Sequence, residues 1–115
     1  MKQDNIWLIN LDPTIGAEIK KTRPAIIVNN HFMEKLPLKI IVPLTNWKEK
    51  YKIAPWMIKI EANPKSGLTK ISSADCFQIR SISEKRFVRK LGKVSTHEIE
   101  MIQLGISKVL SLEKK

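Results

Sequence analysis

Lys20-Lys21-Thr22-Arg23-Pro24-Ala25-Ile26-Ile27-Val28 is the stretch around which the chain is organised. Three cations and a hydroxyl lead directly into four apolar residues, and the block 25–28 predicts a buried strand. Pro24 lacks a backbone donor, so it favours the start or the edge of that strand. Arg23 is then expected on the last loop residue, where its planar, charged guanidinium can meet a phosphate. A solvated basic loop explains the same residues equally well.

The 115-residue chain is strongly basic, because 21 Lys and Arg against 11 Asp and Glu give a net charge of +10. This length predicts one domain, residues 1–115, with one modest core. Dispersed positive charge favours nucleic acid over a membrane surface. Cys76 is the single cysteine, expected in the core, and it excludes an intrachain disulfide or a metal site of the usual Cys/His spacing. No signal-peptide or membrane-spanning pattern occurs, so a cytoplasmic location is expected.

Apolar runs separated by turn residues predict a mainly β chain. Strands are expected at 6–10, 25–28, 39–44, 56–60, 73–79 and 87–94, the last broken at Gly92. A loop is expected at 11–22, short helical turns at 31–35 and 83–86, and a basic connector at 48–52. Ser95 and Glu98 fit a capping box, and helical apolar spacing extends that helix to Lys114 and Lys115. This order predicts a small, strongly bent β-barrel with helices attached.

Few residues offer obvious catalytic chemistry. His31 and His97 are the only histidines, and both are expected in structural or surface positions. Trp7 is expected in the core, whereas Trp47, after a strand end, is the tryptophan expected to be most exposed and able to stack on a base. The polar segment 72–80 is interpreted as a solvated sheet face, with Asp75 on the same side as Phe77 and Ile79 by the period of two.

Several short motifs follow one another along nearly the whole chain. They are Ile6-Trp7-Leu8, Leu11-Asp12-Pro13-Thr14, Gly16-Ala17-Glu18, Thr22-Arg23-Pro24, Val42-Pro43-Leu44-Thr45, Gln78-Ile79-Arg80-Ser81-Ile82 and Arg86-Phe87. In this combination the chain resembles the PemK/MazF toxins of bacterial toxin–antitoxin systems. The resemblance implies a mainly β fold with helices, a small SH3-like or CcdB-like barrel with a C-terminal α-helix. It implies metal-independent, sequence-specific cleavage of single-stranded mRNA, with no cofactor. It also implies a homodimer and a cognate antitoxin that occupies the RNA groove and joins the toxin in binding DNA.

The resemblance also assigns roles residue by residue. Arg23 matches the family's active-site arginine, Thr45 its active-site threonine and Glu18 a loop glutamate, and these three are the expected catalytic residues. The expected RNA-binding residues are Lys20, Lys21, Thr22, Asn46, Trp47, Asp75, Gln78 and Arg80. The chain departs from some members at Ala17, where they carry a histidine, and at Phe77, where they carry an acid.

Cleavage without a metal can use the 2′-hydroxyl of the RNA as nucleophile, so the protein must stabilise charge on the phosphate and manage two protons. Arg23 suits the first task but is a poor base. Thr45 can donate a hydrogen bond to the phosphate, and Glu18 is the candidate base.

Two other functions stay open. One is a toxin of the same fold that poisons a protein such as DNA gyrase, which is disfavoured because the chain lacks the C-terminal tryptophan of the CcdB type. The other is a non-catalytic RNA-binding module.

Overall fold

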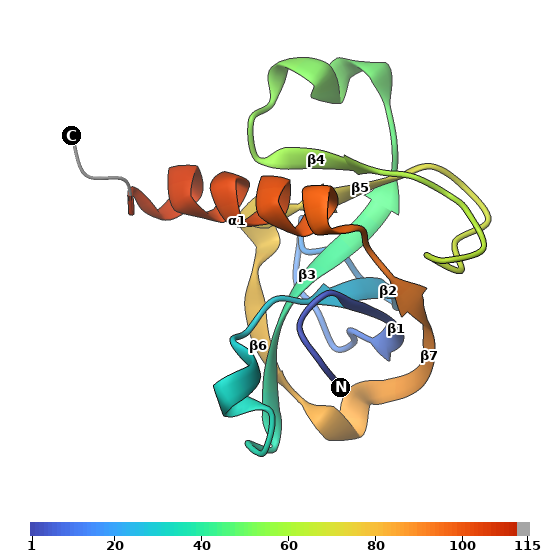
Figure 1. Cartoon of the computed structure of the whole chain (residues 1–115), viewed down its shortest axis with the longest axis vertical. Helices are drawn as coiled ribbons and strands as arrows, with labels where there is room; N and C mark the ends of the chain where they lie inside the picture. The colour runs from blue at the N-terminus through green and yellow to red at the C-terminus, as the bar shows by residue number, and fades with distance from the viewer. Residues whose placement is uncertain (113–115) are drawn as a thin grey trace.

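The structure, a computed structural model, describes residues 1–112. An antiparallel sheet forms most of the molecule, and one long helix lies across it (Figure 1). The strands are β1 (Asn5–Asn10), β2 (Thr22–Ile27), β3 (Leu38–Asn46), β4 (Met57–Ile60), β5 (Ser72–Asp75), β6 (Arg80–Ser83) and β7 (Phe87–Lys93). The helix α1 covers Thr96–Leu110, and four 3-10 turns are η1 (His31–Met33), η2 (Glu49–Ile53), η3 (Cys76–Gln78) and η4 (Glu84–Arg86).

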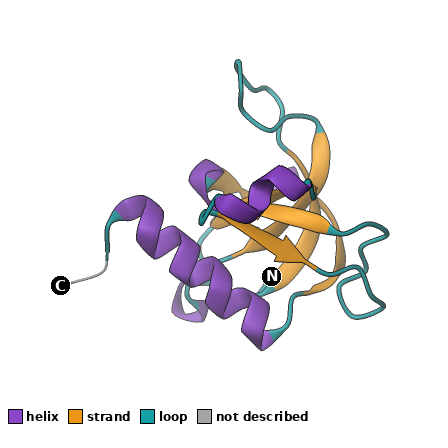
Figure 2. Ribbon diagram, turned by 90° about the horizontal axis from the view of Figure 1, so that it is seen from above, coloured by secondary structure: helices purple, strands orange, loops and turns teal. Residues whose placement is uncertain are grey.

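The sheet follows the order β4-β5-β3-β2-β1-β7, and β6 pairs separately with β3. The nine-residue β3 serves two partners, because its first half pairs with β6 and its last three residues pair with β5. The sheet is strongly bent but does not close, since β4 and β7 are the two ends of the strand path. The expected barrel is therefore an open one, and α1 packs along one side of it on β4 and η3 (Figure 2).

Both faces of the central strands are buried. Ile26 of β2 joins a core with Ile6 and Val42 that α1 covers through Ile102. The alternate residues Ala25 and Ile27 join a second core with Ile9, Leu11, Ile41 and Ile82. The unbroken apolar run of β2 follows from this arrangement, because a strand buried on both faces needs no polar alternation.

The start of β2 differs from the sequence-based expectation. β2 begins at Thr22, so Arg23 is a strand residue opposite Ile9 of β1 and not the last residue of a loop. Pro24 is tolerated inside the strand because pairing with β3 begins only at Ala25, and at Pro24 the strand has β1 as its paired neighbour. Arg23 is thus held by sheet geometry.

The single strand expected at 73–79 is wrong. β5 ends at Asp75, whose carboxylate accepts a hydrogen bond from the Phe77 amide at 3.1 Å and starts η3. This side-chain cap turns the chain, so Asp75 and Phe77 do not share a strand face. Phe77 is 69% exposed, whereas Ile79 packs on the core beneath α1. The expected solvated face is also wrong at its start, because Ser72 and Ser73 are buried.

The capping box of α1 is confirmed. Ser95 accepts a hydrogen bond from the Glu98 amide at 3.1 Å, and the Glu98 carboxylate accepts one from the Ser95 amide at 2.9 Å. The helix ends at Leu110, because Ser111 adopts a left-handed conformation. The expected end at Lys114 and Lys115 falls outside the described residues. None of the helices within residues 1–112 is long and apolar enough to cross a membrane.

Two backbone segments touch directly beside β7. A Cβ atom at Gly67 would overlap the carbonyl oxygen of Leu91, and one at Gly92 would overlap the carbonyl oxygen of Lys65. The predicted break at Gly92 is not a break, because β7 continues to Lys93 with an irregular register between the Ile6–Gly92 and Trp7–Lys90 pairs. The turn at 63–67 therefore rests on β7 without intervening side chains.

Lys39, near the start of β3, is buried. Its ammonium group donates hydrogen bonds to the carbonyl oxygens of Glu34 at 3.1 Å, Leu36 and Leu38. It also forms an ion pair with Glu84 at 3.5 Å. The lysine thus satisfies the carbonyls that follow η1 and ties that turn to η4.

Candidate functional site

Arg23 and Thr45 line the same cavity, which has a volume of about 280 Å³. The lining comes from the start of β2, the end of β3 and the segment before β5, namely Arg23, Pro24, Leu44, Thr45, Asn46, Leu68, Thr69, Lys70 and Ser72. Strand register explains the meeting of the two candidates. Ala25 pairs with Pro43 at the end of the antiparallel β2–β3 ladder, so Arg23 and Thr45 each lie two residues beyond this pair and on the same face of their strands as its two members.

The Arg23 guanidinium is positioned by one backbone hydrogen bond. Its Nε donates to the carbonyl oxygen of Lys20 at 3.1 Å, and within residues 1–112 its two terminal nitrogens form no hydrogen bond or ion pair. Thr45 is half-buried and pairs with Ser73 of β5. The cavity is therefore lined by both a guanidinium group and a hydroxyl group, which can each donate hydrogen bonds to a phosphate. Lys70, a residue that the sequence analysis did not single out, adds a second cation to the lining.

Three of the expected RNA-binding residues, which precede Arg23 in the sequence, do not line this cavity. Lys20, Lys21 and Thr22 are all exposed. Lys21 adopts a positive φ of 71°, and its amide donates to the Asp12 carboxylate at 3.1 Å. Asn46 does line the cavity.

Glu18 lies in a neighbouring cavity of about 460 Å³ and not beside Arg23. This second cavity is lined by Ala17, Glu18, Ile19, Pro43, Phe77, Gln78, Ile79 and Arg80. The Glu18 side chain is exposed and accepts a hydrogen bond from the Ile15 amide at 2.6 Å. The two cavities share no lining residue, but each contacts β3, one at Pro43 and the other at Leu44.

Gln78 and Arg80 reach the loop at 11–21 from the opposite side of this second cavity. Gln78 Oε1 accepts from the Ile19 amide at 2.6 Å, and Gln78 Nε2 donates to the Ala17 carbonyl at 3.4 Å. Arg80 donates to the Leu11 carbonyl at 3.4 Å. The resemblance implies RNA contacts for both residues, and in the structure both side chains also hydrogen-bond to the loop.

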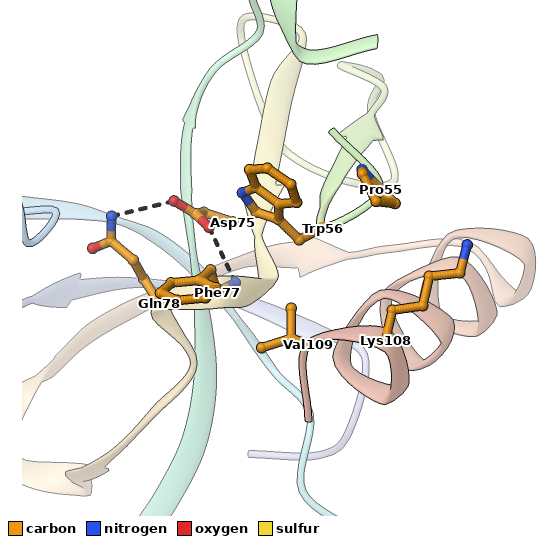
Figure 3. Close-up of a pocket in the computed structure, with 7 residues that line it drawn as sticks. All are labelled: Pro55, Trp56, Asp75, Phe77, Gln78, Lys108 and Val109. Atoms are coloured by element: carbon orange, nitrogen blue, oxygen red, sulfur yellow. Dashed lines mark hydrogen bonds between the residues drawn. The ribbon is translucent and has the colours of Figure 1, made fainter. Parts of the chain in front are cut away.

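A third cavity, of about 380 Å³, lies between η3 and the end of α1. Figure 3 shows Trp56, Phe77 and Val109 around it, with Asp75 bonded to Gln78. Burial raises the pKa of Asp75, and its hydrogen bonds from Phe77 and Gln78 oppose that shift. Asp75 is therefore separated from the Arg23–Thr45 cavity, although it is linked to the second cavity through Gln78.

Trp47 lines a fourth cavity, with Tyr51, Lys59 and His97 among its neighbours. Its ring lies 6.0 Å from that of Tyr51 and 5.4 Å from the Lys59 ammonium. These contacts half-bury Trp47, so the expectation that it is the most exposed tryptophan is wrong: Trp56, at 41%, is more exposed. Trp47 and Asn46, although adjacent in sequence, belong to different cavities.

The remaining candidates behave as expected or carry little chemistry. Cys76 is fully buried, as predicted, and its thiol donates weakly to the Ile102 carbonyl across 3.7 Å. Trp7 is half-buried and packs on the second core with Phe87. His31 and His97 are both exposed.

The sheet and its helix have the fold of MazF toxins. MazF from Deinococcus radiodurans superposes with a TM-score of 0.79 over 96% of each chain, at 17% identity. An endoribonuclease in complex with its cognate antitoxin, from a mycobacterial species, gives a TM-score of 0.77 over 100% of this chain and 99% of that one, at 16% identity. These likenesses establish the fold.

Sequence comparison then gives the family. The chain is 30% identical to endoribonuclease MazF9 of Mycobacterium tuberculosis over 118 aligned residues, which cover 97% of this chain and 98% of that protein. The family model of the PemK-like, MazF-like toxins of type II toxin–antitoxin systems matches residues 2–110. The chain belongs to this family. Membership supports an endoribonuclease toxin over both alternatives, the gyrase poison and the non-catalytic RNA-binding module.

Proposed function

We propose that this protein is a metal-independent endoribonuclease that cleaves single-stranded mRNA at short specific sequences, with Arg23 and Thr45 at the cleavage site. The observation that carries the proposal is the cavity at the start of β2 and the end of β3, which is lined by both a hydroxyl and a guanidinium whose terminal nitrogens are unpaired within the described residues. The net charge of +10 supports a polyanionic substrate.

The chemistry needs a charge stabiliser and two proton transfers. The 2′-hydroxyl oxygen of the RNA attacks the adjacent phosphorus, the bond to the 5′-oxygen breaks, and a 2′,3′-cyclic phosphate forms. A base takes the proton of the 2′-hydroxyl, and an acid gives a proton to the leaving 5′-oxygen. Arg23 stabilises the growing charge on the phosphate oxygens with its two-pronged donor, and Thr45 donates a further hydrogen bond.

Glu18 is the proposed base, and its position sets a condition on the substrate. Because Glu18 lines a different cavity from Arg23 and Thr45, the bound RNA must reach both cavities for Glu18 to take the proton of the 2′-hydroxyl. The exposed residues Lys20, Lys21 and Thr22, together with Asn46, then contact the flanking phosphates and sugars.

The proposed setting is the cytoplasm, where the whole chain acts as one toxin domain, forms a homodimer and is neutralised by a cognate antitoxin. A structural neighbour is described in complex with its cognate antitoxin, which supports the last point. Several large apolar side chains are exposed, among them Phe32, Ile53 and Phe77, and such a surface fits association with further chains. Light scattering at micromolar concentration should give the mass of a dimer, and a monomer would contradict this part.

Incubation of the purified protein with a long RNA in EDTA tests the proposed activity. Discrete fragments ending in 2′,3′-cyclic phosphate are expected, and the Arg23→Ala variant should yield none.

RNA binding should weaken as the salt concentration rises. For single strands, the logarithm of the binding constant should fall with the logarithm of the salt concentration with a slope of about −0.7 per neutralised phosphate. RNA binding without cleavage would indicate the non-catalytic module, and inhibition of gyrase with intact RNA would indicate the protein poison.

A further inference from the structure

The side-chain amide of Gln78 has three hydrogen-bond partners inside the protein. Its Oε1 accepts from the Ile19 amide at 2.6 Å, and its Nε2 donates to the Ala17 carbonyl at 3.4 Å and to Asp75 Oδ2 at 3.2 Å. A glutamine amide has two donor hydrogens, so both have acceptors here. The Ile19 amide is itself a donor, which fixes the oxygen of Gln78 on that side.

The two backbone groups that Gln78 binds lie on either side of Glu18. The carbonyl of residue 17 and the amide of residue 19 are the groups that a neighbouring strand would bind, so Gln78 replaces a strand partner at this point. Its contacts span 59 and 61 residues of sequence. Asp75 also binds Gln78, as Figure 3 shows, because its Oδ2 accepts the hydrogen bond from Gln78 Nε2. Its other oxygen, Oδ1, accepts from the Phe77 amide and caps η3.

We propose that Gln78, held by Asp75, is a positioning residue that fixes the Glu18 loop at the proposed cleavage site and does not itself read the RNA. The proposal deepens the proposed function and rests on it. A hydrogen bond from Nε2 to a base would require Gln78 to give up one of its two present acceptors, the Ala17 carbonyl or Asp75. Residues 17–19, Gln78 and Arg80 line the same cavity, so fixing this loop fixes where the Glu18 carboxylate lies in it.

The first test measures the loop without any RNA. Amide hydrogen exchange is compared between the wild type and Gln78→Met, which keeps side-chain length but removes the amide. Exchange of the Ile19 amide should be about three- to ten-fold faster, the range expected for one hydrogen bond. The Leu11 amide, bonded to the Lys21 carbonyl at 3.0 Å, should not change. Gln103→Met, on the exposed side of α1, is the matched control and should leave both amides unchanged.

The second test asks whether Gln78 acts through Glu18. Single-turnover cleavage is measured for Gln78→Met, Glu18→Gln and the double variant, together with RNA affinity and a melting curve. The expected result is a lower cleavage rate for Gln78→Met at nearly unchanged affinity, and no further loss when it is added to Glu18→Gln. A direct RNA contact would instead lower the affinity and add its full effect in the double variant.

These results separate the two proposals. If the wild type does not cleave RNA, the proposed function fails, and the exchange experiment still decides whether Gln78 holds the loop. If the wild type cleaves RNA but exchange at Ile19 is unchanged in Gln78→Met, the positioning role is overturned. Additive losses in the double variant would overturn it as well.

Discussion

The Arg23–Thr45 cavity and the Glu18 cavity are built in different ways. Arg23 and Thr45 lie on two neighbouring strands, each two residues beyond the Ala25–Pro43 pair, so the backbone ladder constrains their relative position. Glu18 lies on a loop whose residues on either side of it, Ala17 and Ile19, hydrogen-bond to the side chain of Gln78. A ladder has many bonds that support one another, whereas these two bonds depend on a single side-chain amide. The Arg23–Thr45 geometry should therefore tolerate local damage better than the Glu18 geometry, and the two regions should respond differently to substitution.

The largest expected effect is on the rate of RNA cleavage at the Arg23–Thr45 cavity. Arg23→Lys should lower single-turnover cleavage of a short RNA by about 10²–10³, or roughly 3–4 kcal/mol of barrier, because lysine keeps the charge but loses the planar two-pronged donor. Non-specific RNA affinity should largely survive, since it depends on charge.

A melting curve on the same Arg23→Lys sample provides the control. The folded state loses one hydrogen bond, from Nε to the Lys20 carbonyl, so stability should fall by only about 1 kcal/mol or less. Cleavage close to the wild-type rate would show that Arg23 serves as bulk charge, and a much larger stability loss would show that its main role is structural.

A pair of glycines compares the scaffolds of the two cavities directly. Gly67 precedes residues 68–70, which line the Arg23 cavity, and Gly16 belongs to the Glu18 loop; both have positive φ, +70° and +59°. Gly67→Ala should cost about 2–4 kcal/mol, because the new Cβ overlaps the Leu91 carbonyl as well as straining the backbone. Gly16→Ala meets no atom within 4 Å and should cost only about 1 kcal/mol.

Urea unfolding of the two glycine variants measures this difference. Cleavage by Gly16→Ala is the informative second readout, because it reports the Glu18 loop without a large change in stability. Equal costs at the two glycines would mean that the turn at 63–67 is free to move away from β7, contrary to the close contact seen here.

The effect that is smallest near neutral pH concerns Cys76, which begins the turn that carries Gln78. Burial, with a smaller contribution from the Asp75 charge, raises the pKa of its thiol from 9.0 to about 12. The folded state therefore holds this proton more tightly than the unfolded state, and the resulting stability is present below about pH 9 and lost as the pH rises towards 12. In that window the free energy of unfolding should fall by up to about 1.4 kcal/mol per pH unit more in the wild type than in Cys76→Ala.

Denaturant unfolding at a series of alkaline pH values checks this slope difference, and the Cys76→Ala control removes the contribution of the lysines and Tyr51. A thiol reagent at pH 8 should react with Cys76 only on unfolding, since the thiolate is scarce and buried. Fast labelling of the folded protein would show that η3 opens easily, and that the Gln78 contact is weaker than its hydrogen bonds indicate.

Local patterns in the sequence predicted the elements that local contacts determine. The Ser95–Glu98 capping box, the short turn at His31 and most strands involve residues only a few positions apart, so spacing and residue type suffice. The end of β5 at Asp75 was missed because a strand-like run continues past it, and only the side-chain cap on Phe77 turns the chain.

The candidate site depends on contacts that periodicity does not encode. The meeting of Arg23 and Thr45 requires the β2–β3 register, which places together residues 22 positions apart. The family resemblance named both residues, but it grouped Glu18, Asp75 and Trp47 with them, and the structure distributes these over three other cavities. The role of Gln78 has no local signal, since its partners lie 59 and 61 residues away.

The buried Lys39 bears on how the protein responds to covalent modification. Three carbonyl oxygens and the Glu84 carboxylate surround its ammonium group, and acylation would remove the positive charge while adding bulk where there is no solvent. Surface lysines can accept such a group with the sheet intact. The folded protein can be acylated at Lys39 only if the segment between η1 and β3 opens first. Acylation at this position would therefore show that the molecule had left its native conformation.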